Sequence, residues 1–271
     1  FISGKFPNRG PGILLDAQIP IYENINHNIF DFIKENDKIE IKENLLLKSG
    51  LKVPLKAITK NQWDKSQKIS QKNIQKEMDL FIDNTLYYME EEKDELFLPR
   101  KLPTLHVNIQ GRPVLLVVRG HHYIDDLMKL SGFICRNKPI LIGIDGGGDG
   151  FCSLGYTPDI IFGDMDSASD DALKKTKEIV VHSYLNGRCP GEKRLKRLGL
   201  AYEKYSCFGT SEDAAILMSY FMGASIIVTV GSHNNIIDFL EKNRKGMSST
   251  ILIRMLTGSK LIDAKGFFKL F

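Results

Sequence analysis

The sequence predicts an α/β fold with a doubly wound parallel sheet, preceded by a small β-rich unit and a long helix. Apolar runs typical of buried strands alternate with helical patterns between Val107 and Phe271. Two of these runs, Ile140–Ile144 and Pro158–Phe162, end in turns of glycine and aspartate. The longest helical pattern, Gln62–Leu98, comes before them. We therefore expect a β-rich unit at residues 1–60, a helix with its linker at 61–106, and the α/β domain at 107–271.

Composition limits the class of protein. A chain of 271 residues suffices for two domains, or for one domain with an appendage. Its 42% apolar and 26% charged residues are ordinary for a globular protein, and a net charge of +4 gives no argument for a nucleic-acid partner. The four cysteines form no CxxC pair, so we expect reduced, cytosolic thiols rather than a zinc site or a disulfide framework. No apolar run approaches the ~18 residues of a membrane span.

The first 59 residues contain short elements and no catalytic constellation. We expect a turn-rich loop at Pro7–Gly12 and a short amphipathic helix at Asn28–Asn36. Lys38–Ile41 and Leu45–Lys48 enclose a Glu-Asn turn, which predicts a β-hairpin. Leu51–Ile58 adds a strand, and its proline favours a position at a sheet edge.

A heptad-like stripe runs along the long helix. Its members recur at intervals of three and four residues: Ile74, Met78, Phe81, Thr85 and Tyr88. The stripe either packs on the rest of the chain or forms a seam with a second subunit, and the sequence leaves both alternatives open. The second alternative predicts a homodimer. Prolines at positions 99 and 103 end the helix and mark a linker.

The α/β domain has further expected elements. The other expected strands are Val114–Val118, Lys177–His182, Tyr202–Phe208 and Ser225–Val230. The expected helices are Tyr123–Leu130, Asp213–Met222, Ile236–Asn243 and Ser249–Leu256. Because open parallel sheets bind ligands outside the carboxyl ends of their strands, we expect a site in the loops that follow these strands.

Carboxylates and glycines follow two consecutive strands. The first strand ends at Asp145-Gly146-Gly147-Gly148 and the second at Gly163-Asp164-Met165-Asp166-Ser167. Asp164 and Asp166 flank one residue, so both can reach one hard cation, and Mg²⁺ is usually held by one or two carboxylates together with substrate phosphates. A turn that merely caps a helix is the alternative for either segment alone. Two such turns after consecutive strands favour a shared Mg²⁺ site.

Two further segments suit phosphate binding. Gly209-Thr210-Ser211-Glu212-Asp213 precedes a helix whose N-terminus attracts anions, although a capping box alone would also explain it. Lys174–Lys204 holds nine Lys or Arg and three Glu, a net charge of +6. Arg188 in this segment, with Lys193 and Arg194 nearby, is a candidate to bind a polyphosphate, and so is Arg119 after the first strand. A solvated helix face is the alternative for the basic residues around Lys193.

The Asp145-Gly146-Gly147 turn and the run Pro158–Ser167 resemble the catalytic domain of thiamin pyrophosphokinase, over roughly Val114–Ser232. That family transfers a diphosphate from ATP to a hydroxyl, with Mg²⁺ held by aspartates. The resemblance implies metal ligands at Asp145, Asp164, Asp166 and Asp213, of which the last three are catalytic. It implies nucleotide contacts at Arg119, Gly120, Asp145, Gly146, Gly147, Ser167, Arg188, Thr210 and Ser211. The family's lysine–aspartate pair is absent and Gly231-Ser232-His233-Asn234 replaces its arginine–aspartate–histidine element, so we expect an acceptor other than thiamin.

A second resemblance, to the SteA-like proteins of bacterial cell division, extends along nearly the whole chain. The segments that carry it are Ile2–Asn8, Arg188-Cys189-Pro190-Gly191, Gly209–Asp213 and Asp263-Ala264-Lys265-Gly266. It implies a place beside the cytokinetic ring, cell-division partner proteins and a piece of chain before Phe1. It also implies a cytoplasmic location, tethered to the inner face of the membrane through a segment that follows Phe271.

Two functions stay open at this point. One is a thiamin-pyrophosphokinase-like transferase that binds Mg²⁺ and an ATP-type nucleotide. The other is a catalytically degenerate nucleotide sensor or scaffold of cell division. A P-loop is excluded because no GxxxxGK[ST] motif occurs. A haloacid-dehalogenase-type phosphatase is disfavoured because Asp164 follows at least two earlier strands, and a glycosyltransferase Asp-x-Asp site leaves the Asp145 turn unexplained.

Overall fold

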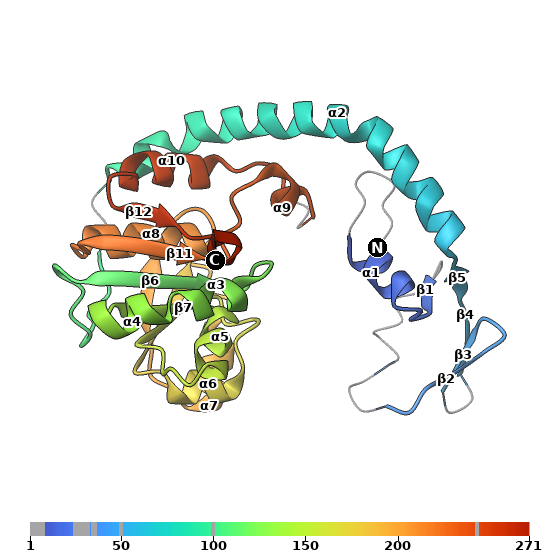
Figure 1. The fold of residues 1–271 in the computed structure, drawn as a ribbon, viewed down its shortest axis with the longest axis horizontal. Helices are drawn as coiled ribbons and strands as arrows, with labels where there is room; N and C mark the ends of the chain where they lie inside the picture. Colours follow the sequence, from blue (N-terminus) through green and yellow to red (C-terminus); the bar gives the residue numbers. More distant parts are fainter. Residues whose placement is uncertain are drawn as a thin grey trace. The chain divides into compact units, whose positions relative to one another are not determined.

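The computed structural model describes residues 9–23, 33, 37–48, 51–98, 101–241 and 244–270. The chain divides into two compact units (Figure 1). The first comprises Phe1–Asp83 with Ile236–Lys245, and the second comprises Asn84–Asn235 with Gly246–Phe271. Each unit has buried apolar clusters of its own.

The second unit is built on a seven-stranded sheet in the order β10-β9-β8-β7-β6-β11-β12, and every neighbouring pair is parallel. The strands are β6 (Pro113–Val118), β7 (Ile140–Ile144), β8 (Ile160–Gly163), β9 (Glu178–Ser183), β10 (Glu203–Ser206), β11 (Ile226–Val230) and β12 (Leu261–Asp263). The chain runs outward from β6 to β10 and then returns to place β11 on the other side of β6. This confirms the expected parallel sheet and is compatible with a doubly wound α/β fold.

Helices cover both faces of this sheet (Figure 1). They are α3 (Tyr123–Lys129), α4 (Ser131–Asn137), α5 (Gly147–Ser153), α6 (Asp170–Lys175), α7 (Glu192–Leu198), α8 (Ser211–Phe221) and α10 (Ser248–Thr257), and η3 (Phe267–Leu270) follows β12. Alternate strand residues point to opposite faces: Val114 and Leu116 pack with α8 and α10, whereas Leu115 and Val117 pack with α3 and α5. The strands are buried on both faces, which explains their continuous apolar runs. The sequence analysis did not define α4, α6, α7 or β12 as elements.

The first unit contains two small antiparallel sheets. One pairs β1 (Ile21–Glu23) with β5 (Lys56–Ile58), and the other has the order β2 (Glu40–Lys42), β3 (Leu45–Lys48), β4 (Leu51–Pro54). The β2–β3 hairpin is as expected, and its two turn residues, Glu43 and Asn44, both have positive φ, at 49° and 62°. Two-residue hairpin loops favour this conformation because it matches the twist of the flanking strands. Pro54 lies on an edge strand, as predicted.

Two sequence expectations for this unit were wrong. Leu51–Ile58 is not one strand, because β4 and β5 belong to different sheets and the Leu55 N–H between them donates to the Asn44 carbonyl over 2.7 Å. Residues 9–12 of the expected turn-rich loop begin helix α1 (Arg9–Asp16), where Gly12 lies against the indole of Trp63. The expected helix at Asn28–Asn36 lies outside the described residues, apart from position 33.

The long helix is α2 (Lys60–Glu92), which continues into η2 (Lys93–Leu96). Its stripe packs largely on this chain: Phe81 and Thr85 are 3% and 5% exposed, and Phe81 makes an edge contact with Phe239 of α9 (Ile236–Glu241). Tyr88 is 40% exposed, and the side chain of Ile74 lies outside the described part of the chain. Phe81 and Thr85 are therefore not available to a seam with a second subunit, and the homodimer stays a prediction. None of the described helices, α2 included, is both long and apolar enough to cross a bilayer.

Candidate metal centre

Three carboxylates converge at the carboxyl ends of two adjacent strands. Asp145 follows β7, and Asp164 and Asp166 follow β8. β7 and β8 are paired in parallel, with Ile144 opposite Phe162. Each carboxylate offers one oxygen within 4.8 Å of the others. We call Asp145, Asp164 and Asp166 the carboxylate triad.

The backbone around the triad adopts conformations that side chains usually avoid. Asp145 and Met165 are left-handed, with φ of 47° and 64°. The Met165 N–H donates to Oδ1 of Asp145 over 2.8 Å, and the Asp145 N–H donates to the Phe162 carbonyl over 2.9 Å. Gly163 lies so close that a Cβ built on it would collide with the Asp145 carboxylate. Left-handed non-glycine residues persist only where surrounding contacts hold them, and they often mark functional sites.

The electrostatics of the triad favour a bound cation. Burial and, after it, the charge of Asp164 raise the pKa of Asp145 from its usual 3.8 to about 7, and the hydrogen bond from the Met165 N–H offsets part of this rise. Ionised carboxylates that share a site repel one another, which disfavours the charged form. A hard divalent cation removes that repulsion, and carboxylate oxygens are the ligands that Mg²⁺ takes in proteins.

Three of the expected nucleotide residues lie beside the triad. The Gly146 N–H donates to Oγ of Ser167 over 3.2 Å, and Nη2 of Arg119 donates to the Ser167 carbonyl over the same distance. The Arg119 guanidinium lies over Gly146, where any Cβ would collide with it, and Asp149 is 3.6 Å away. The Arg119 side chain is 53% exposed. The structure thus places an accessible cationic group next to the acidic cluster.

Gly120 and Gly147 serve close backbone packing. A Cβ on Gly147 would collide with the Val117 carbonyl, and one on Gly120 would collide with the Gly231 carbonyl. Both glycines therefore let the loops after β6, β7 and β11 approach one another.

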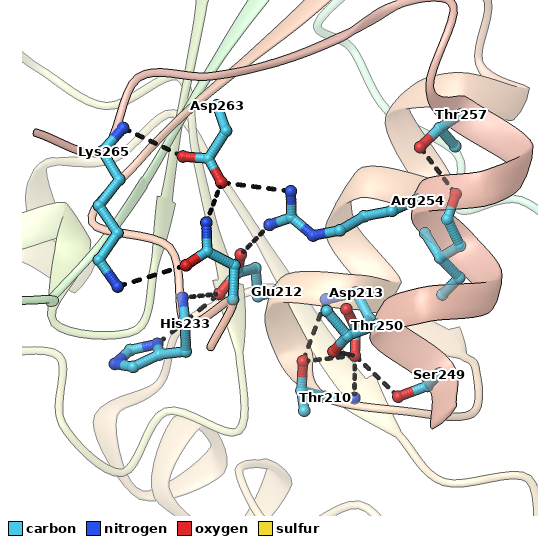
Figure 2. Close-up of polar contacts among 12 residues, drawn as sticks. Thr210, Glu212, Asp213, His233, Ser249, Thr250, Arg254, Thr257, Asp263 and Lys265 are labelled. Carbon is cyan, nitrogen blue, oxygen red and sulfur yellow. Dashed lines mark hydrogen bonds and ion pairs between the residues drawn. The ribbon is translucent and has the colours of Figure 1, made fainter. Parts of the chain in front are cut away.

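Asp213 is not among the carboxylates that converge in the described structure, and its role as a fourth metal ligand stays a prediction. It is 1% exposed and forms a capping box with Thr210 at the start of α8. Its Oδ2 also accepts hydrogen bonds from Ser249 and Thr250 over 2.8 and 3.0 Å (Figure 2). Desolvation and the charge of Glu212 raise the pKa of this carboxyl, and the hydrogen bonds from Ser249 and Thr210 offset part of the rise. These contacts support the interpretation of Gly209–Asp213 as a capping box at the start of α8.

The remaining expected residues lie on other loops. Oγ of Ser211 is 3.3 Å from Nδ1 of His182. Arg188 lies in the loop after β9, with its guanidinium carbon 5.9 Å from the centre of the Tyr184 ring and its N–H bound to Asn186. These contacts of Arg188 are local to its loop.

An ionic network that was not expected from the sequence surrounds the buried Glu212 at the ends of β11 and β12 (Figure 2). Arg254 reaches from α10 to Oε1 of Glu212 over 3.2 Å and to Oδ2 of Asp263 over 3.3 Å. Asn234 also donates to Asp263, over 2.6 Å, and the His233 N–H donates to Glu212 over 3.1 Å. The segments Gly231–Asn234 and Asp263–Gly266, separate in the sequence, are thereby brought together.

Glu212 is the centre of this network and is 6% exposed. Burial alone would raise its pKa, but the hydrogen bonds from His233 and the charges of His233 and Arg254 outweigh burial and lower it. Glu212 therefore stays ionised in the interior. No local pattern in the sequence signals this pair, because Arg254 lies 42 residues further along the chain.

The triad, the Arg119 guanidinium and the surrounding glycine turns form one site that can hold a hard cation and an anionic group beside it. Comparison of the chain with protein-family models gives no match, and comparison with curated proteins gives none either.

Proposed function

We propose that this chain binds Mg²⁺ together with the phosphates of an ATP-type nucleotide at the carboxyl edge of its sheet. The observation that supports it most is the convergence of Asp145, Asp164 and Asp166 within 4.8 Å on two left-handed turns. The donor set fits Mg²⁺, since it offers only carboxylate oxygens. Asp145, Asp164 and Asp166 would hold the ion.

The phosphate part of the proposal depends on Arg119. Its guanidinium is accessible, carries a fixed positive charge, and lies beside Ser167, the residue that follows Asp166. A guanidinium donates to phosphate oxygens in pairs, so a polyphosphate that meets the ion can also meet Arg119. In the catalytic form of the proposal, which follows the resemblance to thiamin pyrophosphokinase, the reaction is diphosphoryl transfer from ATP to a hydroxyl acceptor other than thiamin. Protein groups then act by positioning and by charge stabilisation.

A second candidate function is a nucleotide-responsive scaffold of bacterial cell division, homodimeric and SteA-like. The position of Asp213 favours it, because a family ligand has become a structural cap. The first turn of α10, which supplies Ser249 and Thr250 to Asp213, also supplies Ser248, whose hydroxyl donates to Glu92 of α2 over 2.6 Å. Hydrogen bonds thus connect the start of α8 with the long helix, and that helix contributes residues to both compact units.

Isothermal titration tests the binding, and phosphorus NMR separates the two candidates. ATP and GTP are titrated with Mg²⁺ into the wild-type chain and into Asp164→Asn with Asp166→Asn. Asp171→Asn is the matched control, because Asp171 is exposed on α6, close in sequence to the triad but outside it. We expect Mg²⁺-dependent binding by the wild type and the control only. AMP released in the presence of an alcohol would indicate the transferase, and binding without turnover would indicate the scaffold.

A further inference from the structure

Met165, the residue between Asp164 and Asp166, is held in an unfavourable conformation. Its φ is 64°, in the left-handed region that residues other than glycine rarely adopt. Its side chain is fully buried in a cluster that includes Leu195 of α7. Because Asp164 and Asp166 flank Met165, the backbone conformation of Met165 determines the directions in which both side chains leave the turn. Contacts that hold this conformation therefore also determine the geometry of the triad.

The side chain of Arg194, on α7, binds the backbone carbonyl of Met165. Its Nη1 donates to the Met165 carbonyl, and its Nη2 donates to Oδ1 of Asp170 over 2.5 Å. The Arg194 side chain is 24% exposed. A planar guanidinium can make both bonds at once, which an ammonium group does less well. This pairing corrects the expectation that Arg194 belongs to a basic turn that binds phosphate, because these donors contact the protein.

The start of α7 lies directly against the acidic turn. Gly191, the residue before α7, is so close that an added Cβ would lie 2.6 Å from the Asp164 carbonyl. Gly191 and Arg194 thus contact two consecutive carbonyls of the turn, those of Asp164 and Met165. Since the Met165 N–H is bound by Asp145, the peptide units around Met165 are fixed on both sides.

From these contacts we propose that Arg194 is a positioning residue of the carboxylate triad. It holds the left-handed Met165 so that Asp164 and Asp166 point to the same cation as Asp145. The inference rests on the proposed function, because it concerns the binding of a divalent cation by the triad. Outer-shell partners of metal ligands typically contribute 10- to 100-fold to metal affinity.

The direction in which cation affinity changes when Arg194 is replaced distinguishes a positioning role from a purely electrostatic one. Removing a positive charge near a cation site strengthens cation binding if only Coulomb forces act. Loss of a positioning contact weakens it. Arg197, exposed on the same helix, is the matched control, because it is the same residue type and makes none of the contacts to Met165 or Asp170 described for Arg194.

The test is a titration of Mn²⁺, followed by electron paramagnetic resonance, into the wild type, Arg194→Ala, Arg194→Lys and Arg197→Ala. We expect about a tenfold loss of Mn²⁺ affinity for Arg194→Ala, a smaller loss for Arg194→Lys, and no loss for Arg197→Ala. Methylguanidinium should restore binding to Arg194→Ala. Melting curves without metal establish that each variant is folded. If Arg194→Ala does not fold, the Mn²⁺ affinity of Arg194→Lys is compared with that of the wild type instead.

Wild-type affinity in folded Arg194→Ala and Arg194→Lys would overturn the positioning role and leave the proposed function in place. Tighter binding by Arg194→Ala would do the same, since it would show a purely electrostatic effect. If the wild type binds no Mn²⁺, the proposed function fails and the positioning role fails with it.

Discussion

The backbone N–H of Met165 donates to the carboxylate of Asp145 over 2.8 Å, and both residues are left-handed. Together with the bond from the Gly146 N–H to Oγ of Ser167, this hydrogen bond joins the turn after β7 to the turn after β8. It brings three carboxylates together and helps to hold two strained residues in place. The acceptor, the Asp145 carboxyl, is also the group whose pKa is raised to about 7. The residue that helps to fix the two turns is therefore also the one whose charge depends on pH near neutrality.

Asp145→Asn should stabilise the metal-free protein and remove its affinity for divalent cations. The amide keeps an acceptor for the Met165 N–H, tolerates a left-handed backbone, and carries no charge to be desolvated. A pKa raised from 3.8 to about 7 corresponds to a gain of up to about 4 kcal/mol in the free energy of unfolding at pH 8. Urea unfolding with and without Mg²⁺ measures both effects. A variant less stable than the wild type at pH 8 would contradict this account of Asp145.

Two quantities should change with pH in opposite directions: the stability of the metal-free chain and its affinity for a divalent cation. Because the folded pKa of Asp145 lies above its unfolded value of 3.8, the metal-free folded state binds the extra proton, and its stability falls as the pH rises from about 4 to about 7. Cation binding requires the ionised form, so affinity should rise up to about tenfold per pH unit and level off above pH 7. Calorimetric titration of Mg²⁺ between pH 5.5 and 8.5 checks this. Equal affinity at the two extremes would refute it.

Arg254→Met should destabilise the chain by about 1–3 kcal/mol, because the buried Glu212 carboxylate loses its guanidinium partner and keeps only its contacts with His233. The double variant with Glu212→Gln should regain much of that loss, since the unpaired charge is gone. Arg197→Met, at an exposed position, should stay within about 0.5 kcal/mol of the wild type. Thermal unfolding followed by circular dichroism gives all three values. Additive effects of the two substitutions would show that the pair is not coupled.

Phe81→Ala should cost about 3–5 kcal/mol, because Phe81 is 3% exposed and packs on Phe239. Leu80→Ala, at a position 49% exposed on the same helix, should be nearly neutral. Chemical denaturation of the two variants compares them directly. A larger effect for Leu80 than for Phe81 would show that the exposed face of α2 is covered in solution.

The predicted homodimer needs a different test from the Ile74–Tyr88 stripe, since substitutions at Phe81 would disturb the fold of the chain itself. Leu86 and Tyr87 are each 60% exposed on α2. If that face joins two copies, Leu86→Asp with Tyr87→Asp should halve the mass measured by light scattering and leave the circular dichroism spectrum unchanged. A dimer mass in the double variant would exclude this face as the interface.

The sheet could be predicted because its strands are buried on both faces, so each is a continuous apolar run such as Ile140–Ile144. The triad could be predicted because parallel neighbours end at one edge. Short helices such as α6 and α7 have six or seven residues and too little periodicity to stand out. The sequence could not distinguish a capping role from a ligand role for Asp213, and only the positions of Ser249 and Thr250 show what its carboxylate contacts.

The contact between Arg254 and Glu212 shows what sequence reasoning misses: a pair 42 residues apart that only the packing of α10 on α8 brings together. The same holds for Arg194, whose contact with the acidic turn at Met165 depends on where α7 packs. Local patterns predict strands, turns and caps. They do not predict which side chains of separate helices lie within hydrogen-bond distance of one another.

The central claim is that Asp145, Asp164 and Asp166 hold a divalent cation that recruits nucleotide phosphates. The most direct measurement is calorimetric titration of ATP into the wild-type chain at pH 8 with Mg²⁺ and, separately, with EDTA. The account predicts saturable heat with Mg²⁺, no heat with EDTA, and no heat for Asp164→Asn with Asp166→Asn under either condition. Binding of equal strength in EDTA, or the absence of heat in Mg²⁺ at millimolar ATP, would contradict it.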